Sequence, residues 1–282
     1  MKFAMCRNGP MTGPVVVDGE RVVALSALLD DAPATLDDLV ATRRIGEVRD
    51  PTGIDGVPFG AVQLGMPLVR VRNVVCIGRN YYEHVEEEGA EAMPEPPIFA
   101  KFSSSIVGPG DDVVWSLSTT VDVDWEAELA VVIGSPTVDV SVDKALDHVA
   151  AYTCVNDVSA RDLQFDDVQW TRGKSLRTFC PMGPWLVTPD EVGDVTDLAV
   201  LCRVNGVVKQ DSRTSQMIHG VAEVISFVSQ HIGLDAGDVI ATGTPGGVGY
   251  FANPRERLTD GDVVEVEVEN IGILINHCRA LA

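Results

Sequence analysis

Two glutamates at alternating positions are the first residues in the sequence whose types and spacing could do chemistry. Glu126 and Glu128 lie in VDVDWEAELAVVIG, residues 121–134, and the residues that follow them are apolar on both faces of a β-strand. Unpaired carboxylates at the mouth of a buried strand would cost several kcal/mol or take up protons. Hard oxygen ligands with no His or Cys nearby favour Mg²⁺ or Mn²⁺. Asp122 and Asp124 precede the apolar run and are expected to be solvated.

Metal binding is one of several interpretations of this stretch. The glutamates could pair with Arg or Lys from elsewhere, or the strand could be an edge. The stretch VVEVEVEN near the C-terminus also alternates glutamate with valine and needs only a strand with one wet face. A third oxygen ligand would favour a metal, and Asp157 ends the strand that follows a helix predicted at 141–150. Asp162 and Asp166 are rivals, but they fall in the next loop and are expected to be caps or solvated.

A histidine and a glutamate three residues apart form a second candidate group. On a helix, His84 and Glu87 would share a face, and the carboxylate would raise the basicity of the imidazole and fix its tautomer. Such a pair suits a general base that acts through water, although an exposed surface pair is the commoner case. The other four histidines have no comparable partner: His148, His219, His231 and His277.

A lysine and a glycine-rich loop complete the candidates. Lys174, in TRGKSLRTFCPMGP, could stabilise a developing enolate or carboxylate, with an exposed lysine as the default interpretation. The loop ATGTPGGVG, residues 241–249, resembles an anion-binding loop, because glycines free backbone N–H groups to face a ligand. It is not a P-loop, since no Gly-Lys-Ser/Thr follows, and no helix pattern opens after it as in a dinucleotide loop.

The elements that must position these residues are mostly strands. Asp18-Gly19 between β-branched runs predicts a hairpin, and residues 1–70 read as a small β-rich N-terminal domain, followed by a catalytic domain at 71–282. Apolar residues recur at helical spacing over 217–232. Many strands with few helices predict the α+β class, mainly β.

Composition narrows the function classes. The 282 residues carry a formal net charge of −21 and no basic stripe, so nucleic acid is not expected as a partner. The sequence contains no apolar run of about 18 residues that would predict a membrane span, and the first residues lack the apolar core of a signal peptide. The six scattered cysteines are typical of reduced core residues. These features predict a cytoplasmic protein.

Five segments in a fixed order resemble the fumarylacetoacetate hydrolase family over roughly residues 71–280. They are CIGRNYYEHVEEEG, DWEAELAVVIG, NDVSARDLQ, TRGKSLRTFCPMGPWLVT and GDVIATGTPGGVG. The resemblance implies a mixed β-sheet roll, a homodimer, and Mg²⁺ or Mn²⁺ held by Glu126, Glu128 and Asp157.

The same resemblance implies roles for further residues. His84 and Glu87 would activate water or move a proton, with Lys174 near the oxygens of the substrate. The substrate-binding residues that it implies are Arg79, Arg161, Gln164 and Thr244, and Lys101 is a weaker candidate. Ile77 stands where fumarylacetoacetase itself has a further acidic ligand, which favours the branch with three carboxylates. Arg177 and Phe102 also depart from the family pattern and leave the substrate open.

The chemistry implied is that of 2-oxo acids with a second carbonyl or carboxylate. Hydrolysis of the C–C bond of an acylpyruvate is the leading prediction. Oxaloacetate decarboxylation or tautomerisation, and isomerisation of 2-hydroxyhepta-2,4-diene-1,7-dioate, are alternatives that need the same site. Two non-enzyme readings stay open: a metal-dependent protein that binds sugar acids, and a structural β-domain whose carboxylates are solvated.

Overall fold

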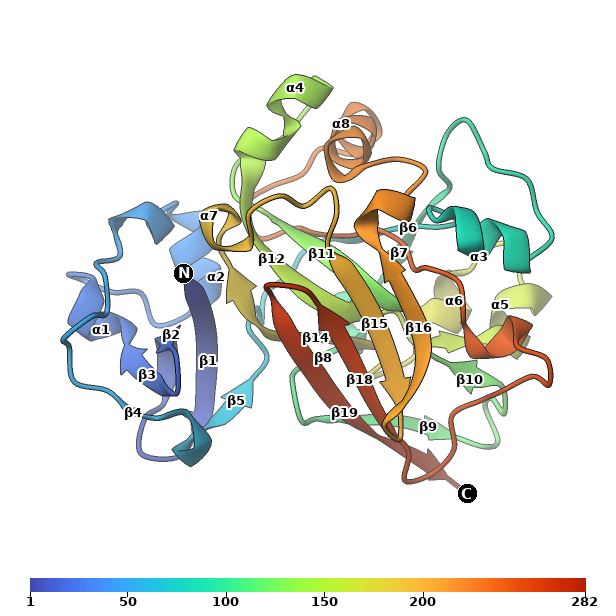
Figure 1. Cartoon of the computed structure of the whole chain (residues 1–282), viewed down its shortest axis with the longest axis horizontal. Helices are drawn as coiled ribbons and strands as arrows, with labels where there is room; N and C mark the ends of the chain where they lie inside the picture. Colours follow the sequence, from blue (N-terminus) through green and yellow to red (C-terminus); the bar gives the residue numbers. More distant parts are fainter.

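Strands dominate the computed structural model, which describes residues 1–282, and most of them lie in two sheets (Figure 1). The larger sheet runs in the order β4 (Val57–Pro58), β3 (Arg21–Ala24), β2 (Gly13–Asp18), β1 (Lys2–Asn8), β14 (Cys180–Val187), β12 (Val149–Asn156), β11 (Ala127–Ile133), β17 (Val239–Ala241), β6 (Val74–Ile77) and β7 (Ile98–Lys101), with β5 (Gln63–Gly65) beside β1 and β8 (Ile106–Val107) beside β14. The smaller sheet runs in the order β16 (Val207–Arg213), β15 (Ala199–Val204), β18 (Val263–Val268), β19 (Gly272–Leu281) and β9 (Asp112–Ser116). The α+β, mainly β class is as predicted.

The helices are short and lie around the sheets (Figure 1). They are α1 (Leu25–Leu28), α2 (Leu36–Ala41), α3 (Tyr82–Glu87), α4 (Val142–Ala145), α5 (Arg161–Asp166), α6 (Thr171–Lys174), α7 (Pro189–Val192) and α8 (Val221–His231). A separate two-residue ladder joins β10 (Val123–Asp124) to β13 (Ser159–Ala160). Even α8, with 11 residues, is too short to cross a bilayer, and no helix meets the length and apolarity of a membrane span.

The predicted N-terminal hairpin is formed by β2 and β3. Asp18 pairs with Arg21, so the two residues of the turn are Gly19 and Glu20, one position later than predicted. Gly19 has φ +59°, which a residue without a Cβ adopts at low cost. These N-terminal strands continue the large sheet through the pairing of β1 with β14. The domain boundary at residue 70 stays a prediction.

The strand β11 is buried along its whole length, as the two apolar faces predicted. All seven of its residues are buried, between β12 on one side and β17 on the other. The control stretch behaves differently, since in β18 the glutamates are partly exposed while the alternating valines are buried. The two similar patterns therefore have different environments, because β11 is central in a covered sheet.

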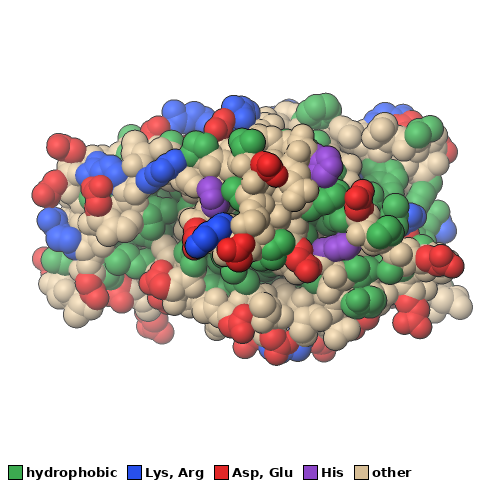
Figure 2. All heavy atoms as spheres, turned by 90° about the horizontal axis from the view of Figure 1, so that it is seen from above, with side chains coloured by type: hydrophobic (Ala, Val, Ile, Leu, Met, Phe, Trp, Pro, Cys, Tyr) green, Lys and Arg blue, Asp and Glu red, His purple; other side chains and the backbone are tan.

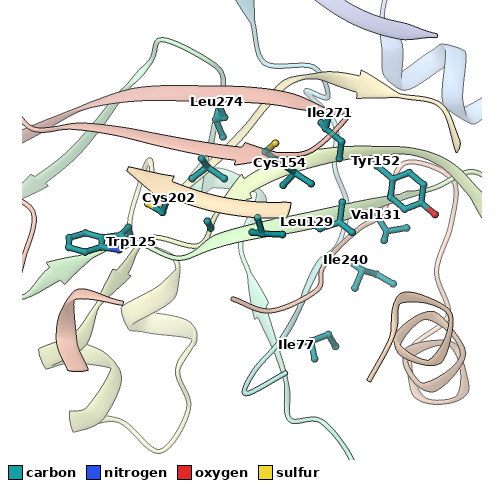
Figure 3. Packing of buried hydrophobic residues seen from close by; sticks show 14 of the residues in the cluster. Ile77, Trp125, Leu129, Val131, Tyr152, Cys154, Cys202, Ile240, Ile271 and Leu274 are labelled. Atoms are coloured by element: carbon teal, nitrogen blue, oxygen red, sulfur yellow. The ribbon is translucent and has the colours of Figure 1, made fainter. Parts of the chain in front are cut away.

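The core lies on both faces of the large sheet. Leu129 and Val131 point into the space between the two sheets, where they pack in one cluster with Cys154, Cys202 and Leu274 (Figure 3). The alternate residues of the strands, together with the N-terminal helices, form a second cluster on the opposite face. Each Leu or Val so buried contributes about 1.5–3 kcal/mol. All six cysteines are buried and free, as predicted.

Two predicted helices are shorter than expected. The helix predicted at 141–150 ends at Ala145, and a 3₁₀ turn over Leu146–His148 leads directly into β12. The later helix begins at Val221, because the backbone N–H of Gly220 is capped by the Glu223 side chain at 2.9 Å.

On the face seen in Figure 2, Lys and Arg lie in small separate groups among Asp and Glu.

Candidate active site

Three buried carboxylates meet at the end of β11 and β12. The antiparallel register pairs Ala127 with Asn156, which sets Glu126 opposite Asp157, and the N–H of Asp157 donates to the Glu126 carbonyl at 2.9 Å. One oxygen from each of Glu126, Glu128 and Asp157 lies within 4.8 Å of the others. The structure therefore brings the three predicted metal ligands together, and their burial contradicts the reading in which they are solvated.

Cationic side chains surround two of the three carboxylates. Lys174 Nζ lies 2.7 Å from Glu126 Oε2 and 3.0 Å from Asp157 Oδ2. Arg161 Nη2 lies 2.7 Å from Glu126 Oε1, and Lys101 Nζ forms an ion pair with Asp157 Oδ1. The alternative in which the glutamates pair with Arg or Lys is thus correct for Glu126 but not for Glu128. It also places Lys174 and Lys101 in the interior, where an exposed lysine was the default for Lys174.

Glu128 differs from its neighbours because it has no cationic partner. Its Oε2 accepts the backbone N–H of Gly243 at 2.8 Å, and no ion pair to it is formed. Burial, followed by the nearby charges of Asp157 and Glu126, raises the pKa of Glu128 well above its usual range. Glu126 is also buried, but Lys174 and Arg161 more than offset this and lower its pKa to about 2.

The buried cluster as a whole carries an excess of negative charge. Its four carboxylates face only three cations, so one negative charge is uncompensated when all four are ionised. The carboxylates are Asp124, Glu126, Glu128 and Asp157, and the cations are Lys101, Arg161 and Lys174. An all-oxygen donor set with a negative excess in a buried place fits a hard divalent cation such as Mg²⁺ or Mn²⁺.

Asp124 is where the sequence prediction was wrong. It was expected in solvent, but it is 1% exposed, its Oδ1 accepts from Arg161 Nε at 2.7 Å, and its Oδ2 accepts from the N–H of Tyr250 at 2.8 Å. The pairing of β10 with β13 causes this, because it carries Asp124 beneath the start of α5. Asp122 is partly exposed and faces Arg255 at 3.2 Å, closer to expectation.

Helices α5 and α6 hold the predicted cationic and amide groups over the triad. Arg161 and Gln164 lie one turn apart on α5, and Arg161 Nη1 donates to Gln164 Oε1 at 3.0 Å. Thr244, in the glycine-rich loop, donates to the Ala127 carbonyl at 3.1 Å and accepts from Gln210 Nε2 at 2.8 Å. Asp162 instead accepts from Thr120 Oγ1 at 2.6 Å, away from the triad.

His84 is buried and lies between two carboxylates, so the pair is not the surface pair of the commoner case. Its Nδ1 lies 2.7 Å from Glu87 Oε1, and its Nε2 lies 3.2 Å from Glu88 Oε1. The second Glu87 oxygen accepts the N–H of Gly247 at 2.7 Å, which joins α3 to the glycine-rich loop. Burial disfavours the imidazolium, but the hydrogen bonds to Glu87 and Glu88 raise the pKa of His84 to about 9.

One small cavity of about 20 Å³ reaches Glu126 of the triad, but neither Glu128 nor Asp157 lines it. Its lining consists of Ile77, Gly78, Arg79, His84, Glu88, Phe99, Glu126, Arg161, Gln164, Trp170, Lys174 and Thr244. A Cβ at Gly78 would come within 2.6 Å of the Trp170 ring, so any other residue there requires the ring to shift. Glu88 and Trp170 were not singled out from the sequence. Glu88 lies four residues after His84, so the helical spacing itself is a signal that could have indicated that both carboxylates reach the same imidazole.

Comparison with known proteins agrees with this geometry. Residues 73–279 match the family model described as fumarylacetoacetate (FAA) hydrolase, C-terminal. The fold and the buried carboxylates are those of an enzyme family whose members share this structural core. The chain belongs to the fumarylacetoacetate hydrolase family.

Three relatives illustrate the range of that family. The chain is 42% identical over 274 residues to the human mitochondrial oxaloacetate tautomerase, covering 95% of this chain and 87% of the relative. It is 41% identical over 275 residues to 2,4-didehydro-3-deoxy-L-rhamnonate hydrolase from Sphingomonas sp., covering 96% and 94%. A solved fumarylacetoacetate hydrolase from the psychrophile Exiguobacterium antarcticum superposes with a TM-score of 0.90 at 37% identity, covering 99% of each chain.

Proposed function

We propose that this chain is a divalent-metal-dependent enzyme that acts on 2-oxo acids with a second carbonyl group, and that it hydrolyses a C–C bond of an acylpyruvate-type substrate. Glu126, Glu128 and Asp157 would hold Mg²⁺ or Mn²⁺. The observation that supports this most strongly is Glu128, the one carboxylate of the buried cluster that has no cationic partner. When bound, the ion would act as a Lewis acid toward the carboxylate and 2-oxo oxygens of the substrate.

The side chains around the triad suit the charge that develops when the C–C bond breaks. Lys174 and Arg161 are fixed by ion pairs, so they need no reorganisation to face a developing enolate oxygen. Gln164 and Thr244 line the same cavity and offer neutral hydrogen-bonding groups to the rest of the substrate. Arg79 is the remaining cation of the lining and is proposed to contact the tail of the substrate.

His84 is proposed to move the proton. In hydrolysis it would take a proton from the water that attacks the distal carbonyl, and it would later return it to the carbon that leaves as the enolate. That first step needs the neutral imidazole, while Glu87 and Glu88 favour the imidazolium. One of the two carboxylates must therefore release its ring nitrogen when the substrate binds, and Glu88, at 3.2 Å, makes the longer contact.

Tautomerisation is the second candidate, and the protonated His84 favours it. An imidazolium can deliver a proton to the enol carbon, and the imidazole then takes up the proton that the enol hydroxyl releases, without an attacking water. The human relative is named for this activity on oxaloacetate. The hydrolase candidate has its counterpart in the Sphingomonas relative, which is named as a hydrolase of 2,4-didehydro-3-deoxy-L-rhamnonate.

A substrate panel with Mg²⁺ or Mn²⁺ and an EDTA control separates the two candidates. Acetylpyruvate should yield pyruvate and acetate from a hydrolase, whereas oxaloacetate should lose only its enol absorbance with a tautomerase. Activity that is unchanged in EDTA would refute the metal-dependent chemistry. By family resemblance we also propose a homodimer, which light scattering on the eluted protein tests.

A further inference from the structure

Glu88 is a second carboxylate on His84, and its further contact with Arg79 has no role in the proposed chemistry. It follows α3 directly, and its side chain is 12% exposed. Its Oε2 lies 2.7 Å from Arg79 Nε and its Oε1 lies 3.2 Å from His84 Nε2. The Glu88 side chain thus contacts both basic side chains in this part of the cavity lining, Arg79 and His84.

The surroundings keep Glu88 in this place and in its charged form. Burial opposes ionisation, but the hydrogen bond from His84 and the charges of His84 and Arg79 hold the pKa of Glu88 below its usual value. Arg79 itself is fixed, because its guanidinium carbon lies 5.7 Å from the centre of the Trp170 ring. Counting His84 as the imidazolium, Arg79 and His84 are balanced by Glu87 and Glu88, so no positive charge is left over.

We propose that Glu88 selects the tail of the substrate: it disfavours a second carboxylate and favours an uncharged tail with keto or hydroxyl groups. This rests on the proposed function, in which the carboxylate and 2-oxo end of the substrate lies at the acidic triad. The tail then lies against the rest of the lining, where Glu88 and Arg79 are.

The preference follows from charge and from hydrogen bonding. A tail carboxylate would bring a like charge next to the largely buried Glu88, which is unfavourable because solvent screens the two charges only in part. A hydroxyl of the tail can donate to a Glu88 oxygen, and a keto oxygen can accept from Arg79, without such a cost. The cavity thereby discriminates by repulsion as well as by attraction.

The test compares two acids of opposite tail charge in Glu88→Gln and in a matched control. Acetylpyruvate has a neutral tail and oxaloacetate has a second carboxylate. The control is Glu86→Gln, the same chemical change at an exposed position two residues earlier. In Glu88→Gln, the KM for oxaloacetate should fall about tenfold relative to that for acetylpyruvate, and any effect of Glu88 on the protonation of His84 should appear in kcat instead. Glu86→Gln should leave the ratio of the two KM values unchanged.

A second variant keeps the outcome interpretable. Glu88→Asp retains the negative charge one carbon shorter and should keep the wild-type preference for the neutral tail. An unchanged ratio in Glu88→Gln, with both acids turned over by the wild type, would overturn this inference and leave the proposed function intact. If the wild type turns over neither acid, the proposed function fails. Glu88 is then tested by calorimetric dissociation constants of both acids with Mg²⁺, where equal changes in the variant would overturn its role.

Discussion

Replacement of Asp124 by asparagine should destabilise the chain far more than the same change at Asp122. Asp124 and Arg161 are each about 2% exposed in their side chains and meet at 2.7 Å, and Asp124 also accepts the N–H of Tyr250. Asparagine keeps the size but removes the charge, which leaves the Arg161 guanidinium with less compensation in the interior.

The expected loss in the free energy of unfolding follows from the burial of each ion pair. Removal of one partner of a buried ion pair typically costs about 3–5 kcal/mol. Arg161 keeps its contact with Glu126 at 2.7 Å, so the lower end, about 3 kcal/mol, is expected. Asp122 faces Arg255, whose side chain is 46% exposed, and the loss of such a pair should cost less than about 1 kcal/mol.

Urea unfolding followed by tryptophan fluorescence measures both free energies of unfolding, with the slope against urea compared to verify a common mechanism. Turnover of the 2-oxo acid at saturating Mg²⁺ should fall in Asp124→Asn even where the protein remains folded, because Arg161 is no longer fixed over the triad. Equal unfolding free energies for the two variants would refute the reasoning that Asp124 is a buried partner of Arg161.

Three further predictions concern the imidazole and the cavity. His84→Ala should lose hydrolysis while it keeps Mn²⁺ binding; unchanged hydrolysis would remove the histidine from the mechanism. The folded chain raises the pKa of His84 from 6.5 to about 9, under the influence of Glu87, Glu88 and Glu126. The contacts of His84 with these carboxylates should therefore add about 3 kcal/mol to the free energy of unfolding. This contribution is fully present below pH 6.5 and is lost as the pH rises through 9. Unfolding free energies of wild type and His84→Gln should converge above that pH, and a constant gap would contradict this. Gly78→Ala should lower both melting temperature and activity, since its Cβ meets the Trp170 ring at 2.6 Å, and an unaffected melt would show that the ring can move aside.

The sequence predicts those parts of the site that local pattern determines. The alternation at Glu126 and Glu128, followed by a run that is apolar on both faces, indicates a buried strand, and the strand-helix-strand order brings Asp157 beside it. The spacing of His84 and Glu87 likewise predicts their contact, because side chains three residues apart lie on the same face of a helix.

Long-range contacts are what the local pattern does not contain. Asp124 is buried because two-residue strands pair across 35 positions of sequence, from Asp124 to Ser159, and strands that short have no detectable period. Lys101 contacts Asp157 from a strand that lies several positions away in the order of the large sheet. Glu88 contacts Arg79 because the backbone turns at Arg79, whose φ of +51° lies in the left-handed region. Only Asp124 was expected in solvent, and the three-dimensional arrangement places all three side chains inside or largely inside the protein.

Binding of Mn²⁺ to the metal-free chain, measured by calorimetry and by the loss of the free-ion electron paramagnetic resonance signal, tests the central claim most directly. One Mn²⁺ per chain should bind to the wild type, and Glu128→Gln should weaken that binding by at least about tenfold, because it removes the one buried carboxylate that has no cation. Glu86→Gln should bind as the wild type does. Absence of stoichiometric Mn²⁺ binding, or equal affinity in Glu128→Gln, would contradict the assignment of the buried triad as a metal centre.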